Sequence, residues 1–239
     1  MGGQKLVEFR MLGFPISLDM SWLIIAALIT WSLSTGYFPI VVPYKLTLFY
    51  ILISMVAAVL FFASILLHEL GHSVVARGYG IRIYGIVLYI FGGVAQMERN
   101  PSTPREEFMV AAAGPFISIL LGLLFLGLAG LTRSLDLGHT LYFLFRLLMD
   151  INFTLAVFNL IPAFPLDGGR IFRSIAWKLS GNFRKSTLWA ARAGIGFAWL
   201  LMGYGGWKIL NHATISGIWL IMIGGFLYQT AQATANHYK

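Results

Sequence analysis

LTLFYILISMVAAVLFFASILLHELGHSVVA, residues 46–76, is an unbroken apolar run that carries the group His68-Glu69-Leu70-Gly71-His72 near its end. As a helix, its 31 residues would measure about 46 Å, more than the roughly 30 Å hydrocarbon core of a bilayer. The run therefore predicts a membrane-crossing helix that tilts or projects, and that holds ionisable side chains inside the membrane.

The rest of the chain has the same apolar character. Of its 239 residues, 58% are hydrophobic and 11% are charged, which is too apolar for the wetted surface of a soluble domain. Apolar runs long enough to cross a membrane lie at residues 16–33, 46–76, 108–131, 141–161, 188–210 and 215–230. We expect an all-α polytopic membrane protein with about six transmembrane helices, forming one domain over residues 1–239.

Lysine and arginine are divided unequally between the two sides of these predicted spans. With the N-terminus in the cytoplasm, 13 of the 17 basic residues lie on the cytoplasmic side, three lie outside, and Arg146 lies within a span. The net charge of +8 then follows the positive-inside rule and gives no reason to expect nucleic-acid binding. We expect a multi-pass protein of the cell membrane with a cytoplasmic N-terminus and the lipid bilayer around it.

Two segments outside the spans have the composition of strands. Residues 81–91 are mostly β-branched and aromatic and are followed by Gly92-Gly93, and residues 5–16 have a similar character before the first span. These features predict a small membrane-associated β-sheet or hairpin on the cytoplasmic side. Because an open sheet edge in lipid leaves backbone groups unpaired, we expect the sheet to be shielded or to lie at the interface.

The spacing of His68 and His72 is typical of a metal site. Positions i and i+4 share one face of a helix, so both imidazoles can reach one ion while Glu69 lies beside a metal-bound water. The competing interpretation is a pair of core histidines bonded to carbonyl groups, but ionisable clusters inside a membrane are costly and usually functional. Nine residues separate His68 from Arg77, which places the metal about 13 Å inside the cytoplasmic boundary.

A catalytic zinc usually takes a third protein ligand, and the chain has no cysteine to supply it. The glutamates after His72 all lie in or beside one cytoplasmic loop, which leaves three aspartates: Asp136, Asp150 and Asp167. Asp136 lies in an external loop, and Asp150 lies one helical turn from Arg146, which predicts a paired charge. Asp167 follows two prolines that break a helix, and a broken helix at membrane depth is tolerated where it lines a cavity. Asp167 is therefore the favoured third ligand, with a capping or loop acid as the alternative.

The group at residues 68–72, together with FNLIPAFPLDGGR at residues 158–170, resembles the paired signature of the site-2 protease family of intramembrane zinc metalloproteases, in its prokaryotic form. Residues 91–95 and 113–115 also look like family elements, and we interpret Gly114-Pro115 as a packing feature. The resemblance implies that His68, His72 and Asp167 bind one zinc ion and that Glu69 is the general base.

The resemblance also implies a role for Asn159, which would position the substrate or stabilise the oxyanion, although an amide that packs helices together is the alternative. The family's substrates are the transmembrane helices of membrane-anchored proteins, such as anti-sigma factors or membrane-anchored transcription factors, cleaved in regulated intramembrane proteolysis. Many similar prokaryotic proteins continue into paired CBS domains, and none is visible before Lys239.

Other functions remain possible on the residues alone. A membrane metal transporter or sensor could use the same His68, His72 and Asp167 site, but it has no need of Glu69 as a base. A catalytically idle scaffold is disfavoured because every reactive position is present. If the chain is a protease, an unwound substrate needs partners for its backbone groups, and we expect it to add as a strand to an open edge of residues 81–91. The alternative is that this hairpin only shields the site or anchors the interface.

Overall fold

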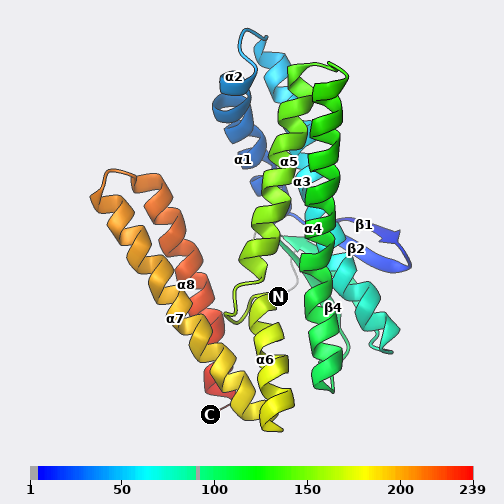
Figure 1. Ribbon diagram of the computed structural model, residues 1–239, viewed down its shortest axis with the longest axis vertical. Coiled ribbons are helices and arrows are strands. Elements are labelled where there is room, and N and C mark those ends of the chain that lie inside the picture. Colours follow the sequence, from blue (N-terminus) through cyan, green and yellow to red (C-terminus); the bar gives the residue numbers. More distant parts are fainter. Residues whose placement is uncertain (1–4, 90–91, 239) are drawn as a thin grey trace. The chain divides into compact units, whose positions relative to one another are not determined.

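The computed structural model describes residues 5–89 and 92–238, and helices dominate it (Figure 1). In chain order its elements are β1 (Lys5–Met11), β2 (Phe14–Asp19), α1 (Ser21–Ser32), the π-helical turn η1 (Leu33–Tyr37), α2 (Phe38–Val41), α3 (Thr47–Gly78), β3 (Ile83–Tyr89), β4 (Gly92–Met97), α4 (Pro104–Ser134), α5 (His139–Asn159), α6 (Asp167–Ser180), α7 (Phe183–Leu210) and α8 (Thr214–His237). Ile90 and Phe91, the end of the expected strand, and Lys239 lie outside the described residues.

Five helical stretches of the described chain are long and apolar enough to cross a membrane: Ser21–Val41, Thr47–Gly78, Pro104–Ser134, His139–Asn159 and Thr214–His237. With the small sheet, they confirm the expected class, a helical polytopic membrane protein. The remaining expected span, 188–210, lies within α7, which is a continuous helix but is not among these five. That α7 crosses the membrane stays a prediction.

The first expected span is wrong at both of its ends. It was expected to begin at Ile16, but Ile16 lies in β2 and is paired with Ile86 of the sheet. The helical stretch runs over Ser21–Val41 instead. Its polar residues do not end it, because hydroxyls such as that of Thr35 donate to a carbonyl of the preceding turn, here that of Trp31 at 2.9 Å.

The described chain divides into two compact units. Unit 1 comprises Met1–Asn100 and Ala113–Ala156, and unit 2 comprises Pro101–Ala112 and Val157–Lys239. Helix α4 belongs to both, since its first residues are part of unit 2 and the remainder part of unit 1.

Unit 1 contains a four-stranded sheet in the order β1-β2-β3-β4. Strands β1 and β2 are antiparallel, β2 and β3 are parallel, and β3 and β4 are antiparallel. Strand β3 is therefore hydrogen-bonded on both sides, and the expectation that residues 81–91 offer an open edge is wrong. The neighbour that the sequence did not reveal is β2, whose residues 16–19 had been assigned to the first span. The open edges among the described strands are those of β1 and β4.

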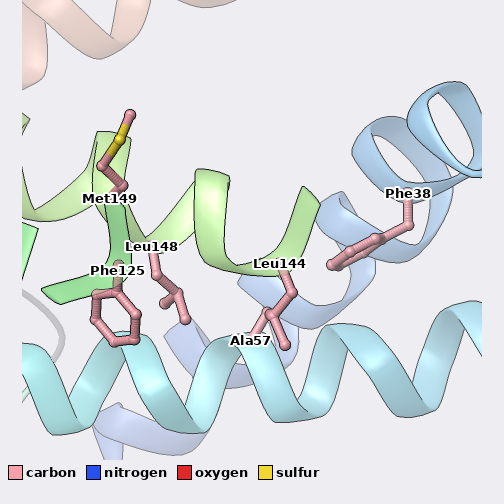
Figure 2. Packing of buried hydrophobic residues seen from close by; sticks show 6 residues of the cluster. All are labelled: Phe38, Ala57, Phe125, Leu144, Leu148 and Met149. Atoms are coloured by element: carbon pink, nitrogen blue, oxygen red, sulfur yellow. The ribbon is translucent and has the colours of Figure 1, made fainter. Parts of the chain in front are cut away.

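The helices of unit 1 pack around a buried apolar cluster, shown in Figure 2, whose members are Phe38, Ala57, Phe125, Leu144, Leu148 and Met149. A polar contact fixes α5 against α3 within this apolar setting. The buried Asn152 donates from Nδ2 to the hydroxyl of Ser64 at 3.1 Å, and interhelical bonds of this kind hold membrane helices together. Ser64 lies one turn before His68, so this contact holds α5 against the part of α3 that precedes the two histidines.

Unit 2 consists mainly of α6, α7 and α8, with a non-helical segment before α6. This broken segment, residues 160–166, contains both prolines that were expected to end the helix. Two of its residues, Ala163 and Leu166, are buried against Ala198 of α7 and Leu227 of α8. The residue that follows the segment, Asp167, opens α6 and is 9% exposed.

Candidate metal centre

The two histidines on α3 are placed as the sequence predicts. His68 and His72 are each 4% exposed, and their Nε2 atoms lie 3.2 Å apart. With zinc–nitrogen bonds of about 2.0–2.1 Å in tetrahedral geometry, two ligand nitrogens lie roughly 3.3 Å apart. The pair therefore already has the separation that two imidazoles adopt around one ion.

Ser118 of α4 fixes the orientation of one of these rings. Its hydroxyl lies 2.9 Å from Nδ1 of His68, and it is completely buried. When Nε2 of a histidine binds a metal, Nδ1 carries the proton and donates it to a neighbouring acceptor, which holds the ring in place. Ser118 was not predicted from the sequence. The sequence feature that could have identified it is that Ser118 has the one hydroxyl side chain in the apolar run 108–131.

Gly114 of α4 leaves open the space into which both imidazoles point. A Cβ atom at this position would lie 2.2 Å from Nε2 of His72 and 2.6 Å from Nε2 of His68, so no other residue fits there. The two nitrogens thus share a small space next to a residue without a side chain, which suits a metal ion. The expectation that Gly114-Pro115 serves packing alone is therefore incomplete, because Gly114 belongs to the site.

Glu69 lies between the two histidines in sequence and next to the sheet in space. A Cβ atom on Gly93 of β4 would lie 2.6 Å from Cγ of Glu69, so the strand passes directly against this side chain. Gly93 belongs to the segment 91–95 that resembles a family element. Its lack of a side chain gives the carboxylate room beside the strand.

The other two predicted site residues lie in unit 2, at the two ends of the broken segment. Asn159 is the last residue of α5 and is partly buried, and Asp167 is the first residue of α6. The backbone turns back tightly here, since a Cβ on Gly168 would lie 2.2 Å from the carbonyl oxygen of Leu160. A carboxylate at a helix start is favoured by the helix dipole, and Asp167 remains an oxygen ligand of the kind zinc accepts.

The other two aspartates considered as ligands are Asp150 and Asp136. Asp150 accepts a bond from Nε of Arg146 at 3.4 Å, which confirms the predicted pairing, and Asp136 lies in the turn after α4. Among the described residues, neither these two acids nor His139, His212 and His237 belong to a group of three that could hold a metal ion.

Comparison with known proteins identifies a matching family and several similar sequences. The model of peptidase family M50 matches residues 56–135 and 133–203. A Synechocystis protein named as a zinc metalloprotease, sll0528, is 40% identical over 94% of this chain and 58% of its own length. Rip3 of Mycobacterium tuberculosis, also named as a zinc metalloprotease, is 35% identical over 93% of this chain and 56% of its own length.

A solved structure is similar as well. The site-2 protease from Methanocaldococcus jannaschii matches with a TM-score of 0.61 and 30% identity, over 97% of this chain and 95% of that one. The chain thus spans somewhat more than half the length of the two relatives named above, and nearly the whole length of this solved protein.

Proposed function

Because the chain belongs to peptidase family M50, the family of the site-2 proteases, we propose that it is a zinc metalloprotease that cleaves transmembrane segments within the bilayer. One observation carries this proposal. Two buried imidazole nitrogens, 3.2 Å apart, point into the space beside Gly114, and they lie on a helix long enough to cross a membrane. The named metalloprotease relatives support zinc as the cofactor.

The proposed ligands are His68, His72 and Asp167, two imidazoles and a carboxylate, which are donor types that zinc accepts. The set leaves one tetrahedral position for water or substrate, as in catalytic zinc sites. When bound, zinc polarises the scissile carbonyl and lowers the pKa of its water to about 7.

The chain's own residues carry the proton transfers. Glu69 accepts the proton of the attacking water and returns it to the nitrogen of the leaving amine, since a carboxylate next to the water can act first as base and then as acid. The amide of Asn159 donates to the developing oxyanion. Ser118 keeps the ring of His68 in one orientation throughout.

The substrate must be unwound before its scissile amide can reach the site, and its freed backbone groups then need partners. The open edge of β4 can provide them, because Gly93 of this strand lies against Glu69. An extended substrate segment added to β4 would pass close to the general base. Proline at each of positions 94–96 tests this: where the N–H faces away from β3, cleavage should fall while the sheet stays folded, whereas a proline whose N–H faces β3 removes a bond of the sheet itself. Uniform tolerance of these prolines would exclude an edge contact.

We further propose that the substrates are membrane-anchored proteins, of which anti-sigma factors and membrane-bound transcription-factor precursors are the expected kinds. We place the N-terminus in the cytoplasm and the site toward the cytoplasmic face. Since the chain has no cysteine, single cysteines can report orientation. Cysteine at Tyr44, which is 99% exposed, or at Ser134 should react from outside, and cysteine at Ser102 or Ser180 only from the cytoplasm. The reverse pattern would invert the orientation.

A metal transporter or sensor built on the same residues is not favoured by any observation, because such a protein needs no base at Glu69 and the named relatives are metalloproteases. The decisive experiment measures zinc content and cleavage of a model transmembrane substrate in parallel. Glu69→Gln should keep about one zinc per chain and lose cleavage, because the three ligands are untouched. Asp167→Ala should lose zinc. If Glu69→Gln loses zinc to the same extent, the assignment of Glu69 as base is wrong.

A further inference from the structure

Unit 2 contains a buried ion pair that the proposed mechanism does not use. Arg173 of α6 donates from Nε to Oε1 of Glu107 at 2.8 Å, and its Nη2 donates to the same oxygen. Glu107 is 1% exposed and Arg173 is 7% exposed. A buried ion pair is weak evidence for stability, because the cost of removing both charges from water offsets their attraction. Its presence therefore calls for another explanation.

The guanidinium of Arg173 also contacts two aromatic rings. It lies 5.2 Å from the ring centre of Phe164 and 5.1 Å from that of Phe183, within the range of cation–π attraction. Phe164 belongs to the broken segment and Phe183 begins α7, while Glu107 lies in the first turn of α4. One side chain thus joins α6 to three other parts of the same unit.

The contact with Phe164 matters because this residue lies three positions before Asp167. The backbone of Phe164 is already held by α7: its N–H donates to the carbonyl of Ala190 at 3.3 Å, and a Cβ on Gly194 would lie 2.0 Å from its carbonyl oxygen. Arg173 fixes the remaining freedom, that of the ring. Both the backbone and the ring of Phe164 are thus in contact with neighbouring elements of unit 2.

We propose that Glu107 and Arg173 are positioning residues that fix the broken segment and so set the direction of the Asp167 carboxylate. This inference rests on the proposed function in one respect, that Asp167 binds zinc. The planar guanidinium suits the task, since it can stack on rings and donate to a carboxylate at fixed angles. Apolar residues could fill the same volume but would not fix direction. Oε2 of Glu107 has no hydrogen-bond partner in the described chain, so the carboxylate depends on Arg173 alone.

The test separates positioning from stability. The double variant Glu107→Met with Arg173→Met should fold and melt like the parent, because apolar replacement of both charges of a buried pair is often neutral. Its zinc Kd should nevertheless rise about tenfold or more, and amide exchange over residues 163–169 should be faster. A double variant with the parent zinc Kd and parent exchange would overturn the proposal.

Two further variants complete the experiment. Arg173→Lys keeps the charge but not the planar geometry, and should weaken zinc binding even if the double variant does not fold; parent affinity in this variant also overturns the proposal. Lys178→Met, on the exposed side of the same helix, is the control and should change neither measurement. Asp167→Ala in the same titration distinguishes an error in the proposed ligand set from an error in the positioning role. If it retains zinc, the proposed ligand set is wrong. If it loses zinc while the double variant binds normally, only the positioning role is wrong.

Discussion

The residues proposed to bind zinc come from two regions that are built in opposite ways. His68 and His72 lie on an uninterrupted helix, where their spacing follows from the helical repeat and the facing helix supplies space at Gly114. Asp167 follows a segment in which the helix has ended, and its position depends on contacts with other elements of unit 2. Metal binding by the histidine pair therefore depends on the open space beside Gly114, whereas the position of Asp167 depends on contacts between elements of unit 2.

The largest effect is expected at Gly114. In Gly114→Ala the new Cβ would lie within 2.6 Å of both Nε2 atoms, so the metal and the methyl group cannot both be accommodated. Zinc content and cleavage should fall to near zero while the protein remains folded. Gly127→Ala on the same helix is the control, because a Cβ there meets nothing within 4 Å. If the Gly114→Ala protein still binds zinc fully, the open space beside Gly114 is not required for metal binding.

A smaller effect is expected from the equivalent change in the aspartate region. In Gly194→Ala the backbone of Phe164 must move, because the Cβ would lie 2.0 Å from its carbonyl oxygen. Overpacking of this kind should lower the free energy of unfolding by about 1–3 kcal/mol, and zinc affinity should weaken without being lost. Unfolding curves and zinc titrations measure both. Gly196→Ala, with no atom within 4 Å of its Cβ, should leave both near the parent values. Equal behaviour of the two variants would remove the distinction between the regions.

Ser118→Ala sharpens the account of the histidine region. The variant keeps the space and both ligands but removes the acceptor 2.9 Å from Nδ1 of His68. Loss of such an outer contact typically weakens metal binding 10- to 100-fold, so zinc should still bind, with an affinity lower by about that factor. Competition with a chelator measures the change, and Ser134→Ala at the exposed end of the same helix is the control. Unchanged affinity would show that helix packing alone orients the ring.

The smallest effect on zinc binding is expected at Asp150, which was not chosen as the third ligand. Asp150→Ala should leave zinc content unchanged, because Asp150 is paired with Arg146 and both side chains are about half exposed. An exposed pair of this type contributes less than about 1 kcal/mol. Zinc analysis and a melting curve are sufficient. A loss of zinc comparable to that in Asp167→Ala would mean that the third ligand has been misassigned.

The sequence predicted the parts of the molecule that depend on local spacing. The i, i+4 pair His68 and His72 and the break before Asp167 follow from helical geometry and from proline chemistry. Ser118 and Gly114 could not be assigned, because their roles depend on which face of α4 meets α3. Ile16 was placed both at the end of a strand-like segment and at the start of a span, because an apolar β-branched residue suits either. Only its partner Ile86, seventy positions later, decides between them.

The pairing of β2 with β3 has a consequence for the biosynthesis of the chain. Between these strands the polypeptide passes through two apolar helical stretches, Ser21–Val41 and Thr47–Gly78, and then returns to pair Ile16 with Ile86. Strands of one sheet lie on one side of a membrane, so the intervening chain must cross an even number of times. The first two strands synthesised must therefore wait, with the β3-facing edge of β2 unpaired, until both helices have formed and β3 arrives.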